Sequence, residues 1–269
     1  MAAEYEMFPL YLGEIVKHEK SSHTYMHHYG EKIRSVFYAF LLKGNGKNIL
    51  VDTGPCDELW AEKYHIPIHV PKNANILNVL EAEHGLHAEN IDYIINTHLH
   101  WDHCFNNNLF PGKRIYVQRK EYHYALDPLS IHRAVYESPQ YGIIPNWMKV
   151  ANQFEFIDGD VEIDDGISVL LLPGHSDGLQ GVLVNTSEGK YLLASDCVNL
   201  YENWEGTDKL PYTLSAIHSD IKAYVSTMDR LKEMERQDHI YIIPGHDERI
   251  MIFRVIPEHN FHTQPGIPG

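Results

Sequence analysis

The chain has 269 residues, of which 43% are hydrophobic and 22% are charged, so it is neither disordered, collagenous nor a coiled coil. This length suffices for a single α/β domain with a core of its own. The 22 basic residues are outnumbered by 37 acidic ones, and the formal charge of −15 argues against nucleic acid or an anionic membrane as partner and favours a small-molecule substrate.

Short apolar runs of strand length recur along the chain and are expected to form β-strands. They are 37–42, 48–52, 91–96, 168–172, 181–184, 191–195 and 240–243. Helical spacing appears at 75–83, where Asn75 is the expected N-cap, and at 219–236, which is amphipathic. Residues 120–150 are expected to be irregular, and the tail at 258–269 is expected to be loose.

The cysteines indicate the expected compartment. Cys56, Cys104 and Cys197 form no CxxC pair, and an odd number argues against a disulfide framework. The first residues lack the basic-then-apolar pattern of a secretory signal, and no apolar run is long enough to span a bilayer. We therefore expect a cytoplasmic protein without a membrane partner.

A faint internal duplication links two strand ends. The run 46–52 resembles the run 189–196, and the two end in Asp52 and Asp196. A histidine follows each aspartate after a further apolar strand, His98 in the first case and His246 in the second. Two such halves facing each other would bring both strand ends to one edge, where ligands collect in α/β proteins.

Four possible metal ligands stand close together in the segment 98–103, which reads His-Leu-His-Trp-Asp-His. In a turn beyond a strand these side chains can converge, whereas along a strand they would alternate between two faces. Imidazole and carboxylate without thiolate suit zinc, manganese, iron or cobalt. Four ligands are too many for one tetrahedral ion from one turn, so two ions are expected. Further candidate ligands follow apolar strands at His175, Asp196 and His246.

These motifs resemble the metallo-β-lactamase superfamily and, within it, the N-acyl-homoserine lactonase family. The likeness extends from Phe37 to about Ile256 and rests on 50–54, 98–103, 115–122, 172–175, Asp196 and 245–247. It implies an α/β fold, namely a four-layer αββα sandwich with pseudo-twofold related halves, as one domain over residues 1–269. It also implies a metal-dependent hydrolase that opens a lactone, an activity associated with quorum quenching.

The resemblance further implies a role for each site residue. One ion would be bound by His98, His100 and His175, the other by Asp102, His103 and His246, and Asp196 would bridge the two. Asp52 would accept a ring N–H from a ligand histidine, unless it only forms the strand-end turn. The two ions, zinc in the first instance, would supply a bridging hydroxide, and Asp102 would relay its proton to the leaving oxygen.

Departures from the family pattern lie around the expected pocket. Asn199 stands where the family has a tyrosine that donates to the substrate carbonyl, and Tyr201 or Tyr212 is either its replacement or merely packed. Trp101 and Phe105 are candidate substrate contacts with packing as the alternative. The aromatic segment 136–148 is either a lid or an oligomer contact, so a homodimer is a possible assembly.

Other functions remain open at this point. The same metal site would suit a thioester or cyclic-amide hydrolase, and the missing tyrosine also fits a metal-bearing sensor that binds a ligand without turnover. The redox branch of the superfamily has a glutamate where this chain has His100, so oxygen reduction is disfavoured.

Overall fold

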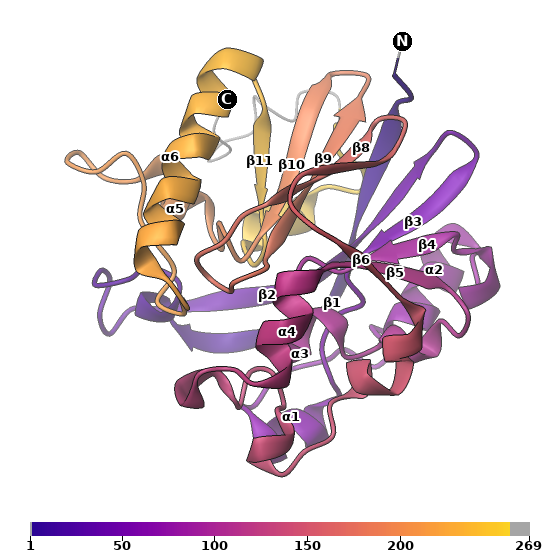
Figure 1. Cartoon of the computed structure of the whole chain (residues 1–269), viewed down its shortest axis with the longest axis horizontal. Coiled ribbons are helices and arrows are strands. Elements are labelled where there is room, and N and C mark those ends of the chain that lie inside the picture. Colours follow the sequence, from indigo (N-terminus) through magenta and orange to yellow (C-terminus); the bar gives the residue numbers. More distant parts are fainter. Residues whose placement is uncertain (1, 259–269) are drawn as a thin grey trace.

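Two mixed β-sheets face each other in the computed structural model, which describes residues 2–258 (Figure 1). The first sheet has the order β1 (Tyr5–Glu19), β2 (Lys32–Gly44), β3 (Lys47–Val51), β4 (Tyr93–Ile95), β5 (Arg114–Gln118), β6 (Phe154–Ile157). The second has the order β11 (Tyr241–Pro244), β10 (Gly189–Ser195), β9 (Gln180–Thr186), β8 (Ile167–Leu171), β7 (Val161–Asp164). The α-helices are α1 (Glu58–Tyr64), α2 (Ile76–His84), α3 (Trp101–Cys104), α4 (Arg119–Leu126), α5 (Tyr201–Glu205) and α6 (Ile221–Asp238).

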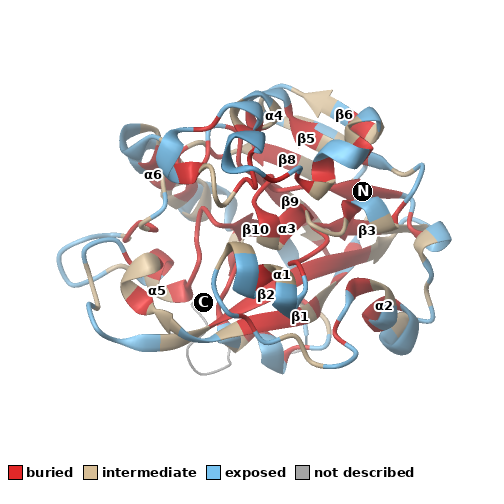
Figure 2. Cartoon of the chain, turned by 90° about the horizontal axis from the view of Figure 1, so that it is seen from below, coloured by how far each residue is buried: buried red, intermediate tan, exposed pale blue. Residues whose placement is uncertain are grey.

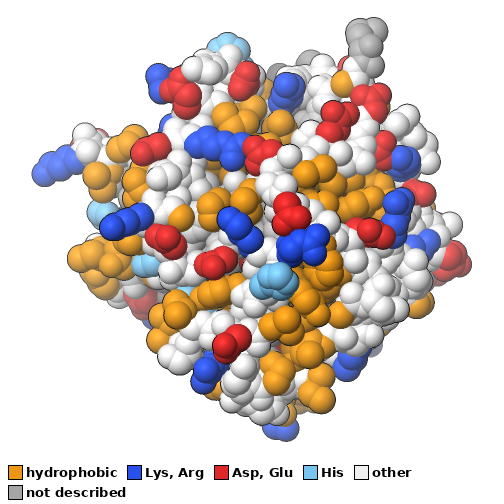
Figure 3. All heavy atoms as spheres, viewed as in Figure 1, with side chains coloured by type: hydrophobic (Ala, Val, Ile, Leu, Met, Phe, Trp, Pro, Cys, Tyr) orange, Lys and Arg blue, Asp and Glu red, His pale blue; other side chains and the backbone are white. Residues whose placement is uncertain are grey.

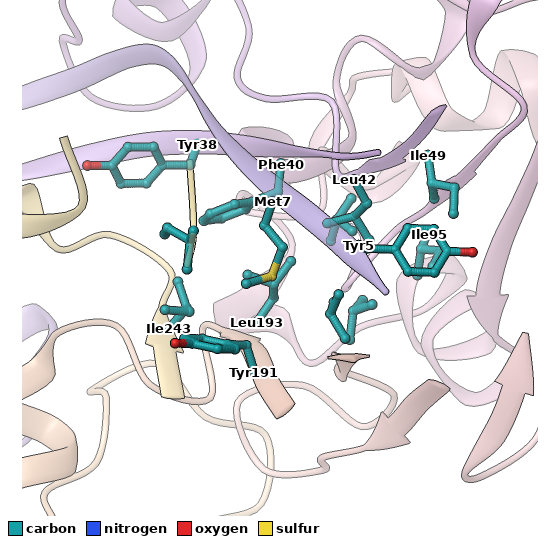
Figure 4. Packing of buried hydrophobic residues seen from close by; sticks show 14 of the residues in the cluster. Tyr5, Met7, Tyr38, Phe40, Leu42, Ile49, Ile95, Tyr191, Leu193 and Ile243 are labelled. Carbon is teal, nitrogen blue, oxygen red and sulfur yellow. The ribbon is translucent and has the colours of Figure 1, made fainter. Parts of the chain in front are cut away.

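Apolar side chains from both sheets meet in the space between them. Figure 4 shows Met7 and Phe40 from the first sheet in one cluster with Leu193 and Ile243 from the second. Full burial of side chains of this size contributes about 1.5–3 kcal/mol each. Helix α2 packs on the outer face of the first sheet and α6 on that of the second, and Figure 2 shows the buried strands between partly exposed helices. The predicted αββα order of layers is thereby confirmed.

The two sheets repeat one pattern of connections. Strands β2 and β3 are antiparallel and β4 runs parallel to β3, while β9 and β10 are antiparallel and β11 runs parallel to β10. The chain turns sharply where β3 and β10 end, at Asp52 (φ 62°) and Ser195 (φ 48°), and non-glycine residues adopt such positive φ values only rarely. The internal duplication of the sequence therefore corresponds to two halves related by a pseudo-twofold axis.

Both predicted helices are present with small shifts at their ends. Asn75 caps α2 by accepting a hydrogen bond from the Asn78 N–H at 3.0 Å, and Gly85 follows in the left-handed conformation with φ 63°. The helix predicted over 219–236 is α6, and its N-cap Asp220 accepts hydrogen bonds from two backbone N–H groups. Capping by Asn75 confirms the predicted start of α2, whereas the Asp220 cap of α6 was not predicted.

The prediction of irregular structure over 120–150 is wrong at its start, where the chain forms α4. This helix buries the charged side chain of Glu121 completely, whereas the pattern argument assigns charged residues to the surface. The remainder of the segment consists of 3₁₀ turns and loops. Helix α1 and strands β5, β6 and β7 were likewise not predicted as elements. Residues 259–269, most of the tail expected to be loose, lie outside the described residues.

The surface charges, the cysteines and the helices can be compared with what the composition indicated. Acidic and basic side chains are interspersed on the face shown in Figure 3. Cys56, Cys104 and Cys197 are all free and buried. Within residues 2–258, no helix has both the length and the apolar character needed to cross a membrane.

Candidate metal centre and cavity

The turn after β4 brings the ligands of the segment 98–103 together. Thr97 fixes its start, because its backbone N–H and its hydroxyl donate to the two Asp52 carboxylate oxygens at 2.8 and 2.7 Å. The short helix α3 then begins at Trp101, whose N–H donates to the Val135 carbonyl at 3.0 Å. The backbone is extended up to His100 and helical from Trp101 onward. The side chains therefore do not alternate between two faces as they would along a strand, and the ligands of this segment point to one centre.

Three ring nitrogens form the first group. Nδ1 of His100 lies 3.0 Å from Nε2 of His98 and 3.2 Å from Nε2 of His175. Ligand atoms about 2.0–2.1 Å from a tetrahedral zinc ion are about 3.3 Å apart, so this spacing fits one ion. All three rings are buried.

Asp196 lies between this group and a second one. Its Oδ2 is 3.4 Å from Nε2 of His175, while its Oδ1 is 3.0 Å from Nε2 of both His103 and His246. Asp102 completes the second group, with Oδ2 at 3.8 Å from the same two Nε2 atoms. One carboxylate thus presents an oxygen to each of two ligand groups, as a bridging ligand does.

Hydrogen bonds behind the rings orient the ligands. Nδ1 of His103 bonds to Asp52 Oδ2 at 2.8 Å, and Nδ1 of His175 and His246 bond to backbone carbonyl oxygens at 3.0 and 2.9 Å. These contacts place the proton on Nδ1 and leave Nε2 for a metal. The buried Nε2 of His103 lies 3.0 Å from Asp196 Oδ1, a spacing that fits two ligand atoms of one cation.

The electrostatics differ between the two ligand groups: the neighbouring carboxylates, Asp196 first, raise the pKa of His103 and His246 above the usual value despite burial. Burial holds the pKa of His98 and His100 well below the usual value, so both rings are neutral. Burial alone would raise the pKa of Asp196, but the neighbouring His246 and His103 hold it well below the ordinary range. In the first group, neutral imidazole beside the ionised Asp196 is the combination that metal ions require, whereas a cation in the second group would displace the protons that Asp196 attracts to His103 and His246.

Glu121 of α4 connects the two ligand loops. Its Oε1 accepts hydrogen bonds from the Leu99 N–H at 2.9 Å and the Tyr136 hydroxyl at 2.8 Å. Its Oε2 accepts from the Ser176 hydroxyl at 2.6 Å and the Gly178 N–H at 3.2 Å. A Cβ at position 178 would lie 2.2 Å from the Glu121 backbone nitrogen, so only glycine permits this approach. The site thus depends on a buried carboxylate outside the ligand set.

A cavity of about 360 Å³ opens beside the ligands. His100, Asp102, Asp196 and His246 form its polar end. Trp101 forms part of its wall, stacked on His65 at 4.4 Å between ring centroids and in edge contact with Phe37 at 5.6 Å. Further apolar lining comes from Ile15, Tyr64, Ile66, Val135, Tyr141 and Ile217. A small molecule with an apolar part and a reactive polar part suits this shape.

Two of the candidate substrate contacts lie elsewhere. Tyr201 packs in the core between the sheets. Its backbone N–H donates to Asp247 Oδ2 at 2.8 Å, and the Arg249 guanidinium lies over its ring, 4.6 Å from the centroid. Phe105 packs against Trp60 of α1, with ring centroids 5.6 Å apart, and lines a separate small hollow. Neither side chain lines the cavity.

Asn199 and the aromatic segment 136–148 do reach the cavity, each in part. Asn199 lines it while 2% exposed. Tyr141 lines it from the segment, whereas Trp147 is buried in the core under the first sheet. Tyr212 does not line the cavity, and its hydroxyl donates to Asp229 at 2.7 Å.

Sequence reasoning missed most residues of the cavity wall and one residue that supports the ligand loops. His23 and Ser35 line the cavity, and Glu121 supports the ligand loops. His23 follows a 3₁₀ turn without any ligand motif, and Ser35 is one residue within a strand. Of these residues, Glu121 alone could have been found from the sequence, because it is the one acidic residue in the stretch 115–122, which is part of the family resemblance.

Known proteins share this fold, and some of them share up to 31% of the aligned residues. A family model described as the metallo-beta-lactamase superfamily matches residues 38–246. The N-acyl homoserine lactonase of Bacillus thuringiensis is 31% identical over 242 residues, covering 86% of this chain and 89% of that relative. The solved N-acyl homoserine lactone hydrolase with N-hexanoyl-L-homoserine at its catalytic metal center has a TM-score of 0.76 at 27% identity, over 96% of this chain and 99% of that one. The dizinc quorum-quenching lactonase AidC, at 16% identity and a TM-score of 0.70 over 92% of this chain and 89% of its own, has the same fold.

Proposed function

The chain belongs to the metallo-beta-lactamase superfamily, and we propose that it is a two-metal hydrolase that opens the ring of N-acyl homoserine lactones. The observation that carries the proposal is the position of Asp196, with one oxygen toward each ligand group. Relatives named N-acyl homoserine lactonases support the choice of substrate. Quorum quenching in the cytoplasm is the corresponding proposed role.

The ligand set favours zinc, with iron, manganese and cobalt as compatible alternatives. Histidine nitrogens and carboxylate oxygens without thiolate are the ligands of hydrolytic zinc sites. His98, His100 and His175 would bind one ion, and Asp102, His103 and His246 the other, as the two groups of the structure are divided. Asp196 would complete both.

Residues around the centre would transfer the proton and hold the acyl group during ring opening. When bound, the two ions supply Lewis acidity and make hydroxide available near neutral pH by lowering the pKa of water. Asp102 lies at the cavity surface, with Oδ2 at 3.8 Å from Nε2 of His246. From there it can accept the proton of the attacking water and return it to the leaving ring oxygen. The aromatic wall around Trp101 would hold the acyl group and exclude bulk water.

Removal and return of the metal test the proposal. We expect chelator-treated protein to lose lactonase activity by at least about 100-fold, and two equivalents of zinc, manganese or cobalt per chain to restore it. The assay should compare acyl homoserine lactones of several chain lengths with an acyl thioester, a lactam and a simple lactone. Hydrolysis of the thioester or the lactam with all lactones inert would contradict the lactonase assignment. Binding of lactones without any product would favour the sensor instead.

The contribution of Trp101 is a separate prediction. Replacing it by alanine removes most of one wall of the cavity, and we expect KM for a long-chain acyl homoserine lactone to rise about 10-fold, with a smaller change in kcat. Trp101→Phe keeps an aromatic wall and should stay within about 3-fold of the wild type. Steady-state kinetics with butanoyl and decanoyl substrates checks this. Equal KM changes for both chain lengths would show that the acyl group binds elsewhere.

A further inference from the structure

A chain of hydrogen bonds surrounds the position where the family tyrosine is absent. Asn199 Nδ2 lies 2.6 Å from His23 Nδ1 and 3.1 Å from the Ser215 hydroxyl oxygen. On the other side of the imidazole, His23 Nε2 lies 2.8 Å from the Ser35 hydroxyl oxygen. His23, Asn199 and Ser35 all line the cavity, and their exposed fractions are 7%, 2% and 1%.

The Asn199 amide nitrogen faces His23 and Ser215, and its Oδ1 is buried without a partner among residues 2–258. With the amide in this orientation, the direction of each hydrogen bond follows. The Ser215 hydroxyl donates to the Ser22 carbonyl at 3.5 Å, so its oxygen accepts from the Asn199 amide. The same amide nitrogen faces His23 Nδ1, which therefore accepts as well. A neutral imidazole that accepts at Nδ1 carries its proton on Nε2 and donates it to Ser35.

This order leaves one donor unused. Because the Ser35 oxygen accepts from His23, its own proton must be donated elsewhere, and among residues 2–258 it has no other hydrogen-bond partner. Both ring nitrogens of His23 are engaged, and so are both amide protons of Asn199. Tyr201, the other candidate donor, lies in the core. The hydroxyl of Ser35 is thus a neutral donor beside Asn199 whose proton has no acceptor among the described residues.

We propose that Ser35 binds the substrate by donating this hydrogen bond to a carbonyl oxygen, and that His23 and Asn199 are positioning residues that set the direction of the bond. The inference rests on the proposed lactonase function and names the group that replaces the family tyrosine. Asn199 then acts on the substrate only through His23 and Ser35. The site is held firmly, since the Asn203 side chain donates to the His23 carbonyl at 2.7 Å and the His246 N–H donates to the Asn199 carbonyl at 2.9 Å.

The first test removes the hydroxyl. In the metal-loaded enzyme, Ser35→Ala should lower kcat/KM for an acyl homoserine lactone about 10-fold, the worth of one hydrogen bond to a substrate oxygen. Ser35→Thr keeps the hydroxyl and should retain most of the activity. Ser226→Ala, which removes an exposed hydroxyl of α6, is the matched control and should leave kcat/KM unchanged. Equal activity of Ser35→Ala and wild type would overturn the proposal.

The second test reads the tautomer of His23 directly. Nitrogen-15 NMR of the zinc-loaded wild type should show His23 protonated at Nε2. Asn199→Asp replaces the donor by an acceptor, so the proton should move to Nδ1 and the Ser35 hydroxyl should then donate to Nε2. This variant should lose about as much kcat/KM as Ser35→Ala, and the double variant no more than either, because both act through one hydrogen bond. Protonation at Nδ1 in the wild type would contradict the proposed direction.

The two proposals fail in different ways. A metal-loaded wild type without activity on any acyl homoserine lactone would remove the proposed function, whatever the tautomer of His23. An active wild type whose Ser35→Ala variant is equally active would remove only this inference.

Discussion

Replacement of Asp196 by alanine is expected to abolish hydrolysis. The substitution removes the one carboxylate that faces both ligand groups, at 3.0 Å from His103 and 3.4 Å from His175. Without it the two cations would repel each other across a gap that no other carboxylate bridges in the described chain. We expect kcat/KM to fall on the order of 1,000-fold or more, equivalent to about 4 kcal/mol of transition-state stabilisation. Kinetics and elemental analysis of the purified variant check this together.

The control for this variant is another aspartate. Asp158 is 67% exposed and, within the described part of the chain, pairs only with Arg119 at the surface, so Asp158→Ala should retain wild-type activity and metal content. The metal content of Asp196→Ala should drop below two ions per chain. A variant that keeps both ions and near-normal kcat/KM would show that Asp196 is not the bridge and would remove the main support for the two-metal proposal.

The metal ligands were accessible to sequence reasoning because their arrangement is local. A ligand after an apolar strand lies at a sheet edge whatever the rest of the chain does, and the segment 98–103 packs four ligands into one turn. The duplication that ended in Asp52 and Asp196 had the same advantage. Both halves use one hairpin followed by one parallel strand, so similar local sequences occupy similar places.

The pocket residues were not accessible, because their positions depend on contacts between distant segments. Phe105 is four residues after Trp101, but its ring is turned toward Trp60 of α1, a helix that no pattern predicted. His23 reaches the site because α5 holds its carbonyl through Asn203, 180 positions along the chain. Spacing along the sequence contains no information on such pairings.

The contacts of Glu121 with both ligand loops likewise join distant segments and could not be predicted from spacing along the sequence. Replacement of Glu121 by alanine should destabilise the protein strongly. Four donors, from Leu99, Tyr136, Ser176 and Gly178, would lose their acceptor in a fully buried place. With about 1–3 kcal/mol for each buried donor left unpaired, and partial relaxation, we expect a loss of about 4 kcal/mol in the free energy of unfolding. Urea unfolding of the metal-free and the metal-loaded protein measures it.

Matched variants separate the hydrogen bonds from the charge. Glu121→Gln keeps the volume and one acceptor oxygen but turns an amide group toward two donors, so about half of the loss is expected. Glu233→Ala removes a glutamate that is 43% exposed, next to Arg236, and should change stability by less than about 0.5 kcal/mol. If the free energy of unfolding of Glu121→Ala lies within about 1 kcal/mol of that of the wild type, the four donors must find other partners, and the hydrogen bonds to Glu121 are not needed for stability.

In Glu121→Ala, metal binding should weaken together with stability. If Glu121 only stabilised the fold, metal affinity would not have to change. Leu99 lies between His98 and His100, and Ser176 follows His175. Glu121 thus accepts from the Leu99 N–H and the Ser176 hydroxyl, which belong to residues adjacent to all three ligands of the first group. Loss of such supporting contacts typically lowers metal affinity 10–100-fold, so we expect about this decrease in a competition assay with a chelator. The ligands of the second group contact Asp52 and Val36 instead, so their ion should be retained more firmly. Sequential release of the two ions from Glu121→Ala, where the wild type holds both, is therefore the expected signature.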